Sequence, residues 1–240
     1  MKNLFFVLLV LPLISFGQKE FDTEIESNSR PGLFYYLTWK TSNKPKSRKY
    51  DRLIFDIYYS GAYSADNISN NSSLNLGFSS NFMNEFALNK KNTISIGTGL
   101  GLSTTKINLN YNLVLGNDNF ISCFPSESYD YQKNSLNGLN FNIPLELRFK
   151  TKGWSHYKIY FGGRLGYQVR LKENYFYDDT DRNYKTSLKK AAEHLTYSIH
   201  TRIGIRNYSI YASYNLNPLF KHVESPKLNW FQLGLSISLF

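Results

Sequence analysis

Apolar and polar residues alternate along the chain with a period of two, and the clearest case is the segment Leu139–Phe149. Every second residue from Leu139 is apolar, whereas the intervening positions carry Asn, Pro, Glu146 and Arg148. Because successive side chains of a strand point to opposite faces, this pattern predicts a strand with one apolar and one charged face. The segment is longer than the roughly 5–6 residues usual in soluble sheets and matches the ~9–11 residues of a transmembrane β-strand.

Seven further segments show the same alternation, which brings the predicted number of strands to eight. In chain order the eight segments are 52–59, 74–83, 94–102, 139–149, 157–171, 195–205, 208–216 and 230–240. After the third segment the apolar parity shifts to Ile107 and Leu109, which predicts a β-bulge near Ser103–Lys106. An even number of strands is typical of bacterial outer-membrane barrels formed by one chain.

The predicted connections alternate between long and short. The long ones fall near 60–73, 114–138, 172–194 and 217–229, and the short ones at 89–92, 150–156 and 206–207. If the first strand starts in the periplasm, every short turn is periplasmic and every long loop is extracellular, as in outer-membrane barrels. The sequence therefore predicts an all-β fold: a closed, eight-stranded, antiparallel transmembrane β-barrel with short periplasmic turns and long extracellular loops.

A soluble β-sandwich or a lipocalin-like barrel also alternates, but its apolar face points inward. Two observations favour an apolar face toward lipid. The polar face combines small residues such as Gly97 and Gly99 with charged ones such as Glu146 and Arg164, as expected in a narrow lumen. Aromatic residues also lie near the predicted strand ends, where the girdles of membrane barrels form.

The N-terminal segment predicts export. Residues 1–17 combine a charged start, an apolar segment and small residues before position 18, which is the pattern of a cleaved signal peptide; an uncleaved anchor is the alternative. Residues 18–50 are then a periplasmic lead-in and 51–240 the barrel. The formal net charge of +10 fits contact with anionic outer-membrane lipid and lipopolysaccharide, and export argues against nucleic acid as a partner. With one cysteine, Cys123, no internal disulfide can form.

Charged residues on the polar face of the predicted strands form the candidate site. They are Asp56, Glu146, Arg148, Arg164, Arg170, His200 and Arg202. Unpaired charge in a narrow interior is costly, so these side chains are expected to form a buried ion-pair network that holds the barrel shut. An eight-stranded barrel is just wide enough to be filled by side chains, which argues against bulk transport.

No catalytic, cofactor or metal site is predicted. Ser198 and His200 share one face with Glu146 opposite, but no nucleophile-elbow GxSxG accompanies them. The other histidines are scattered among turns and loops without metal-ligand spacing. The GTGLG at 97–101 lies within a predicted strand and is not a dinucleotide-binding loop.

Several stretches resemble the PorT-type outer-membrane β-barrel family of Bacteroidetes. They are DRLIFDIYYSG at 51–61, ISIGTGLGLSTTKI at 94–107, NIPLELRFK at 142–150, YFGGRLGYQ at 160–168, YASYNLNPLFK at 211–221 and SPKLNWFQLGLSISLF at 225–240. The resemblance implies an eight-stranded outer-membrane barrel. For the best-known members of the family it also implies a role in type IX protein secretion.

The predicted function is that of a non-enzymatic, multi-pass outer-membrane β-barrel. The resemblance implies a structural or assembly role linked to type IX secretion, with other secretion-system proteins as partners. The alternatives are a surface adhesion or receptor barrel that acts through its loops, and a barrel lipase or protease. The segment 172–194 is a candidate for contact with protein or lipopolysaccharide, and its SLKKAAEH at 187–194 is a candidate short helix.

Overall fold

The computed structural model describes residues 51–64, 75–116, 118, 120–125, 133–151, 157–177 and 182–239. The predicted signal peptide at 1–17 and the predicted lead-in at 18–50 lie outside these residues. All regular secondary structure in the described residues is β-strand. The part of the chain that the structure describes holds no helix long and apolar enough to cross a membrane.

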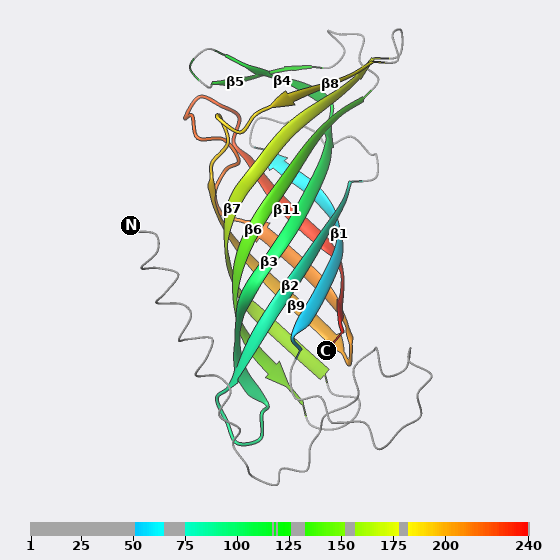
Figure 1. Ribbon diagram of the computed structural model, residues 1–240, viewed down its shortest axis with the longest axis vertical. Helices are drawn as coiled ribbons and strands as arrows, with labels where there is room; N and C mark the ends of the chain where they lie inside the picture. The colour runs from blue at the N-terminus through cyan, green and yellow to red at the C-terminus, as the bar shows by residue number, and fades with distance from the viewer. Residues whose placement is uncertain are drawn as a thin grey trace.

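Eight antiparallel strands close into a barrel (Figure 1), which confirms the predicted fold class. Around the barrel they are β1 (Leu53–Ser64), β2 (Leu76–Ala87), β3 (Ile94–Leu109), β6 (Lys133–Lys150), β7 (Tyr157–Tyr177), β9 (Leu195–Ile205), β10 (Tyr208–Asn215) and β11 (Leu228–Ser238). The pairing of β1 with β11, from Ile54 opposite Ser238 to Ser64 opposite Leu228, closes the barrel. Closure leaves no unpaired sheet edge, which lipid would not tolerate.

Three further strands lie at one end of the barrel (Figure 1). β8 (Arg182–Ser187) pairs with the end of β7, and β4 (Tyr111–Leu115) and β5 (Ile121–Pro125) form a separate hairpin. The two short turns that the structure describes, which contain Asn92 and Arg206, lie at the opposite end, and each uses a residue with positive φ. This is the predicted asymmetry of an outer-membrane barrel, so the short turns are periplasmic and β4, β5 and β8 are extracellular.

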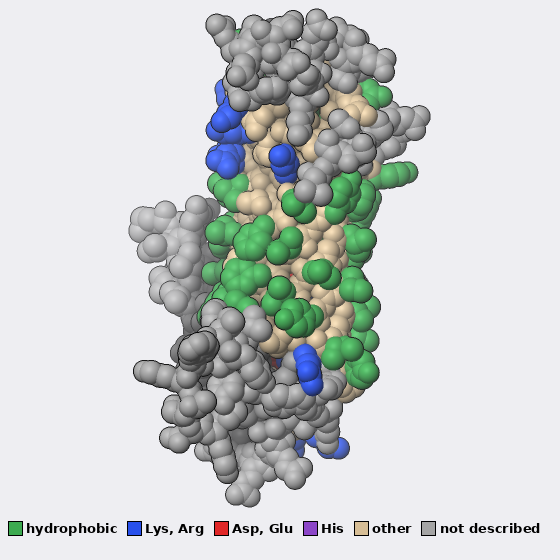
Figure 2. Space-filling view, turned by 90° about the vertical axis from the view of Figure 1, so that its right-hand side faces the viewer, with side chains coloured by type: hydrophobic (Ala, Val, Ile, Leu, Met, Phe, Trp, Pro, Cys, Tyr) green, Lys and Arg blue, Asp and Glu red, His purple; other side chains and the backbone are tan. Residues whose placement is uncertain are grey.

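The barrel wall is apolar outside and polar inside over most of its height. On β6, Leu145 is 59% exposed whereas its neighbour Glu146 is 1% exposed. Figure 2 shows hydrophobic side chains gathered over the middle of one face. The outward set includes Ile57, Phe78, Phe82, Leu100, Leu102, Ile143, Ile159, Phe161, Leu165, Tyr197, Ile203, Ile210, Leu233 and Leu235. A closed barrel with this orientation is a multi-pass outer-membrane barrel, and a lipocalin-like barrel is excluded.

The bulge that the sequence predicts near Ser103–Lys106 is absent. The β3–β6 register is the same at both ends, with Ile94 opposite Phe149 and Leu109 opposite Asn134. Ile107 and Leu109 point inward on the same parity as Ser103. The strand continues without interruption, so each position keeps its face. The apolar residues move from outward to inward positions because the barrel interior becomes apolar toward its extracellular end.

A bulge occurs instead on β7, where the β6–β7 register shifts. Leu139 pairs with Arg170 and Asn140 with Gln168, so Val169 is the extra residue. An extra residue reverses which face later side chains occupy. Leu171 is therefore fully buried and Arg170 is exposed. The prediction that Arg170 faces the lumen is wrong for this reason.

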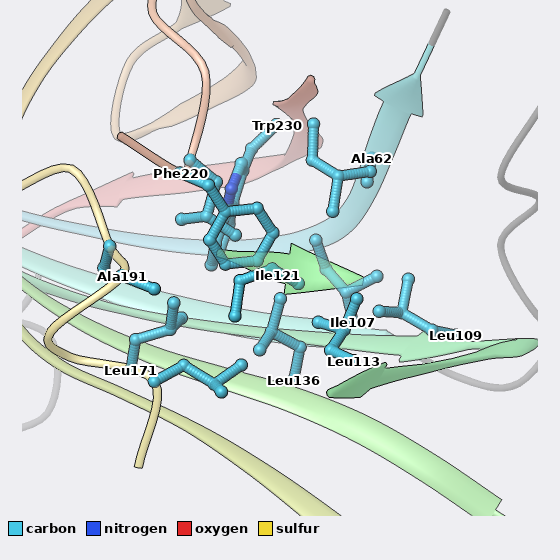
Figure 3. Close-up of a cluster of buried hydrophobic side chains, with 14 residues drawn as sticks. Ala62, Ile107, Leu109, Leu113, Ile121, Leu136, Leu171, Ala191, Phe220 and Trp230 are labelled. Atoms are coloured by element: carbon cyan, nitrogen blue, oxygen red, sulfur yellow. The ribbon is translucent and has the colours of Figure 1, made fainter. Parts of the chain in front are cut away.

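Apolar side chains fill the extracellular mouth of the barrel and form a cluster called here the extracellular plug (Figure 3). Inward residues of the barrel strands meet residues of the β4–β5 hairpin and of the loops after β8 and β10. The plug consists of Ala62, Ile107, Leu109, Leu113, Ile121, Leu136, Leu171, Leu188, Ala191, Ala192, Leu219, Phe220, Leu228 and Trp230. The predicted helix at 187–194 is wrong: this segment ends β8 and continues as a turn, from which Leu188 and Ala191 pack into the plug.

Candidate functional site: the luminal charge network

Charged side chains cross-link the lumen on the side of the short turns and are called here the luminal network. Its members are Asp51, Asp56, Glu85, Glu146, Arg148, Lys150, Lys158, Arg164, His200 and Arg202. Most occupy inward positions of the wall, where strand pairing brings residues distant in sequence side by side. One row across β6, β7 and β9 places Gly162 between Glu146 and His200. Across this row His200 Nε2 reaches Glu146 Oε1 at 2.9 Å, and a Cβ at Gly162 would lie 2.8 Å from the Glu146 Cα.

Arg202 on β9 links two carboxylates from strands that are not its neighbours. Its Nε and Nη2 donate to the two oxygens of Asp56 on β1, at 3.0 and 2.7 Å. Its Nη1 donates to Glu146 on β6. The Asp56 carboxylate also accepts hydrogen bonds from Ser79 at 2.6 Å and Asn81 at 3.0 Å. Both carboxylate oxygens of Asp56 therefore have hydrogen-bond donors, and the Asp56 side chain is completely buried.

Arg148 on β6 makes a second junction nearer the periplasmic end. Its Nη2 lies 2.8 Å from Glu146 Oε2 and its Nη1 lies 2.8 Å from Glu85 Oε2. Lys150 contacts the other oxygen of Glu85 at 2.6 Å. The side chain of Arg148 occupies space left by Gly97 on β3, where a Cβ would lie 2.5 Å from Nε of Arg148. Glycine at 97 is therefore required for the close approach of this guanidinium.

A third contact group lies beside the first residues of β1 and β7. Lys158 Nζ is 3.1 Å from Asp51 Oδ2 and 2.8 Å from Ser238 Oγ. The Tyr160 hydroxyl donates to Asp51 Oδ2 at 2.6 Å. The Tyr160 ring also lies 4.7 Å from the guanidinium carbon of Arg148. Aromatic rings and ion pairs together therefore fill the lumen here, as expected for an interior only wide enough for side chains.

Arg164 on β7 differs from the other cations. Its Nε and Nη2 are buried, and neither has a hydrogen-bond partner among the described residues. The Tyr211 ring centroid lies 5.7 Å from the Arg164 guanidinium carbon, and Asp56 interacts with Arg164 electrostatically without a hydrogen bond between them among the described contacts. Arg164 lines a small cavity between the luminal network and the extracellular plug.

Ser198 and His200 do not form a nucleophile–base pair among the described contacts. His200 Nε2 is engaged by Glu146, and Ser198 makes no hydrogen bond to His200 among the described contacts. Glu146 already accepts from Arg148 and Arg202. A serine nucleophile needs a base within hydrogen-bond reach. Within the described residues, no group of three or more His, Cys, Asp and Glu side chains could hold a metal ion.

One more buried acid, Glu173, lies beyond the lipid-facing part of β7. Its Oε1 accepts hydrogen bonds from the Leu113 backbone N–H at 3.0 Å and from Asn134 Nδ2 at 2.6 Å, and its Oε2 accepts one from the Tyr175 hydroxyl. Glu173 thereby holds the β4–β5 hairpin against the barrel. Burial raises the pKa of its carboxyl to about 7, although these hydrogen bonds favour the ionised form.

Six of the seven predicted site residues line the lumen, and Arg170 does not. Five of the six make one connected set of ion pairs: Asp56, Glu146, Arg148, His200 and Arg202. Glu85 is not among the predicted residues, because the second strand is predicted to end at Met83, two residues earlier on the same inward parity. Asp51 is not among them either, because it precedes its strand and carries no periodic signal.

No family model matches the chain, and no curated protein matches it. Two similar solved structures are crystal structures of Ail, the attachment invasion locus protein of Yersinia pestis, one of them in complex with the heparin analogue sucrose octasulfate. They are 13% and 12% identical to this chain, cover 78% of it and 96% and 95% of the Ail chain, and give TM-scores of 0.35 and 0.33. The barrel assignment rests on strand pairing and side-chain orientation, and membership of the PorT-type family stays a prediction.

Proposed function

We propose that this protein is a non-enzymatic outer-membrane barrel that presents an ordered extracellular surface to a partner and does not conduct solutes. The observation that carries the proposal is the length of β6 and β7, which have 18 and 21 residues. About 9–11 residues suffice to cross the membrane. The surplus lies at the extracellular end, where β7 continues into its pairing with β8.

The extracellular extension is held in place by the barrel. Leu113 and Ile121 of the β4–β5 hairpin are buried in the extracellular plug. The Ile121 N–H donates to Ser225 Oγ at 3.0 Å, and the Leu113 N–H donates to Glu173. An ordered surface loses less conformational entropy on binding than a free loop does, so anchoring of this kind favours recognition.

The extension exposes apolar side chains outside the lipid-facing wall. Val114 is 45% exposed, Phe124 42% and Tyr184 48%. Lys185 and Lys189 are exposed near Tyr184 in sequence. Apolar and aromatic groups beside lysines are suited to a protein partner with acidic surface groups, or to lipopolysaccharide.

The test is site-specific photocrosslinking on intact cells, with a photoreactive residue in place of Val114. The expected result is a discrete adduct that disappears when Phe124→Asp and Tyr184→Asp are added. The matched control carries the photoreactive residue in place of the lipid-facing Leu145 and should give lipid adducts only. A Val114 position that yields no adduct, or the same adducts as Leu145, would overturn the proposal.

A role in type IX secretion is a second candidate, supported by the resemblance of 142–150 and 211–221 to the PorT-type family. Gene deletion followed by comparison of secreted proteins tests it. Loss of export that wild-type protein restores supports the secretion role. Normal export contradicts it and leaves the surface-interaction proposal standing.

The barrel lipase or protease alternative has its own test. Ser198→Ala removes the only hydroxyl beside His200 on the inward face of β9. Under our proposal, lipid A structure and outer-membrane protease activity are the same in cells with this variant as in wild-type cells. A loss of either activity would favour the enzyme.

A further inference from the structure

We propose that the cavity beside Arg164 binds one small monovalent anion, of the size of chloride or bromide. The cavity lies inside the barrel between the luminal network and the extracellular plug. Polar groups of several strands line it, including Ser103, Asn142, Arg164, Thr196, Ser198 and Trp230. No carboxylate is among the residues that line it.

The luminal network contains one more cation than it has acids. Apart from His200, the luminal network contains the acids Asp51, Asp56, Glu85 and Glu146 and the cations Arg148, Lys150, Lys158, Arg164 and Arg202, which is four against five. Each of the other four cations has a carboxylate within 3.1 Å. The surplus positive charge therefore lies on Arg164. A charge buried without a counter-ion is costly, so a guest anion would be favoured here.

The carboxylates nearest to Arg164 are committed elsewhere. Asp56 accepts both donors of Arg202 together with Ser79 and Asn81. Glu146 accepts from Arg148, Arg202 and His200. Turning either acid toward Arg164 would break ion pairs that are already formed.

Two residues that line the cavity carry three donor nitrogens that have no acceptor among the described residues. Arg164 is 6% exposed, and its Nε and Nη2 have no acceptor among the described residues. Trp230 is 3% exposed, and its indole Nε1 also has no acceptor there. Asn140 also lines the cavity, and its Oδ1 has no hydrogen-bond donor among the described residues. Water could satisfy these donors, but only an anion also neutralises the guanidinium.

The size of the cavity limits the guest. It accommodates a single small spherical guest, so a halide is the anion nearest to its size, and the tetrahedral phosphate and sulfate ions are too large. The hydroxyl and amide groups of Ser198, Thr196 and Asn142 would complete the coordination of a halide. No conducting path is required, because the anion would act as a fixed counter-ion.

The test measures urea unfolding of the purified full chain in phospholipid vesicles, with sodium gluconate replaced stepwise by sodium bromide at constant ionic strength. An anion that binds only the folded barrel raises stability by RT ln(1 + [L]/Kd), so the unfolding midpoint should rise with bromide. Arg164→Gln should abolish this rise. The control Arg170→Gln, an exposed arginine of the same strand, should retain it.

The stability of Arg164→Gln without bromide and the position of bound bromide in crystals provide two further tests. In gluconate alone, Arg164→Gln should be at least as stable as wild type, because it removes an uncompensated charge. Crystals grown with bromide should give an anomalous peak within hydrogen-bond distance of Arg164. A midpoint independent of bromide, an equal rise in Arg164→Gln, or a cavity that holds only water would overturn the proposal.

Discussion

Arg202 shows how single side chains hold this barrel closed. It joins Asp56 on β1 to Glu146 on β6, two strands that do not pair with each other or with β9. A buried ion pair adds little net stability compared with apolar packing, but removal of one partner is expensive. The luminal network is therefore most sensitive to loss of one member at a time.

Arg202→Gln is expected to destabilise the barrel by about 3–5 kcal/mol, because Asp56 and Glu146 would stay buried without this cation. The measurement is the urea unfolding free energy in phospholipid vesicles. The control Arg170→Gln changes an exposed arginine and should shift stability by less than about 0.5 kcal/mol. Equal losses in the two variants would contradict the role assigned to Arg202.

Glu173 should make the attachment of the β4–β5 hairpin depend on pH. The folded-state pKa of about 7 lies above the ordinary value of 4.5. The carboxyl therefore contributes stability that is fully present below pH 4.5 and is lost as pH rises from there through about 7. Proteolysis of the hairpin on intact vesicles should be slower at pH 5 than at pH 8.

Glu173→Gln supplies the control for this pH effect, since the amide stays neutral and its carbonyl can still accept from the Leu113 N–H. Its hairpin should be cleaved at the same rate at both pH values, after correction for the protease's own pH dependence. A pH effect that persists in the variant would assign it to another group.

At the scale of elements, the bulge at Val169 sets which residues of β7 face the plug. Deletion of Val169 removes the extra residue, so the β6–β7 register becomes continuous while Leu171 stays in the plug and Arg170 stays outside. We therefore expect the deletion variant to keep the heat-stable folded band on gel electrophoresis, as Val169→Ala should. Loss of the band on deletion, with the band retained in Val169→Ala, would show that the barrel needs the bulge itself.

The extracellular plug should behave as a small protein core. Leu171 is completely buried in it, so Leu171→Ala should cost about 2–5 kcal/mol of unfolding free energy. Leu165→Ala, on the lipid-facing side of the same strand, leaves no internal cavity and should cost less. The comparison uses urea unfolding in vesicles, and equal costs would argue against a tightly packed plug.

Strand periodicity predicted the barrel well because lipid outside and polar groups inside impose the same alternation along most of each strand. The alternation does not identify the outward face where the barrel interior is apolar. Ile107 and Leu109 then looked like lipid-facing residues after a bulge, although they point inward. The true bulge at Val169 leaves no periodic signal, because Tyr167, Val169 and Leu171 keep the apolar alternation going across it.

The contacts of the luminal network were beyond sequence reasoning for a different reason. Inward parity identifies which charges share the lumen, but only strand register and stagger decide which of them meet. Arg148 meets Glu85 because β2 and β6 lie on either side of β3 with Gly97 between them. That contact depends on the shear of the barrel, which periodicity does not reveal.

At the scale of the whole molecule, two kinds of side-chain contact close the lumen. Ion pairs close it near the periplasm, and apolar side chains close it at the extracellular mouth. We expect the purified protein to give no stepwise conductance in planar lipid bilayers. A porin reconstituted in parallel provides the positive control. Reproducible channel openings would contradict a closed lumen.

The order of charges along the chain has a consequence for how the barrel assembles. All four acids of the luminal network, from Asp51 to Glu146, precede all five cations, from Arg148 to Arg202. A partly inserted chain that ends before β7 would carry an acidic inner surface with few cations to neutralise it. Charge balance arrives only with β7, which supplies Lys158 and Arg164, so chains that end before β7 should not persist as partly built barrels in the bilayer.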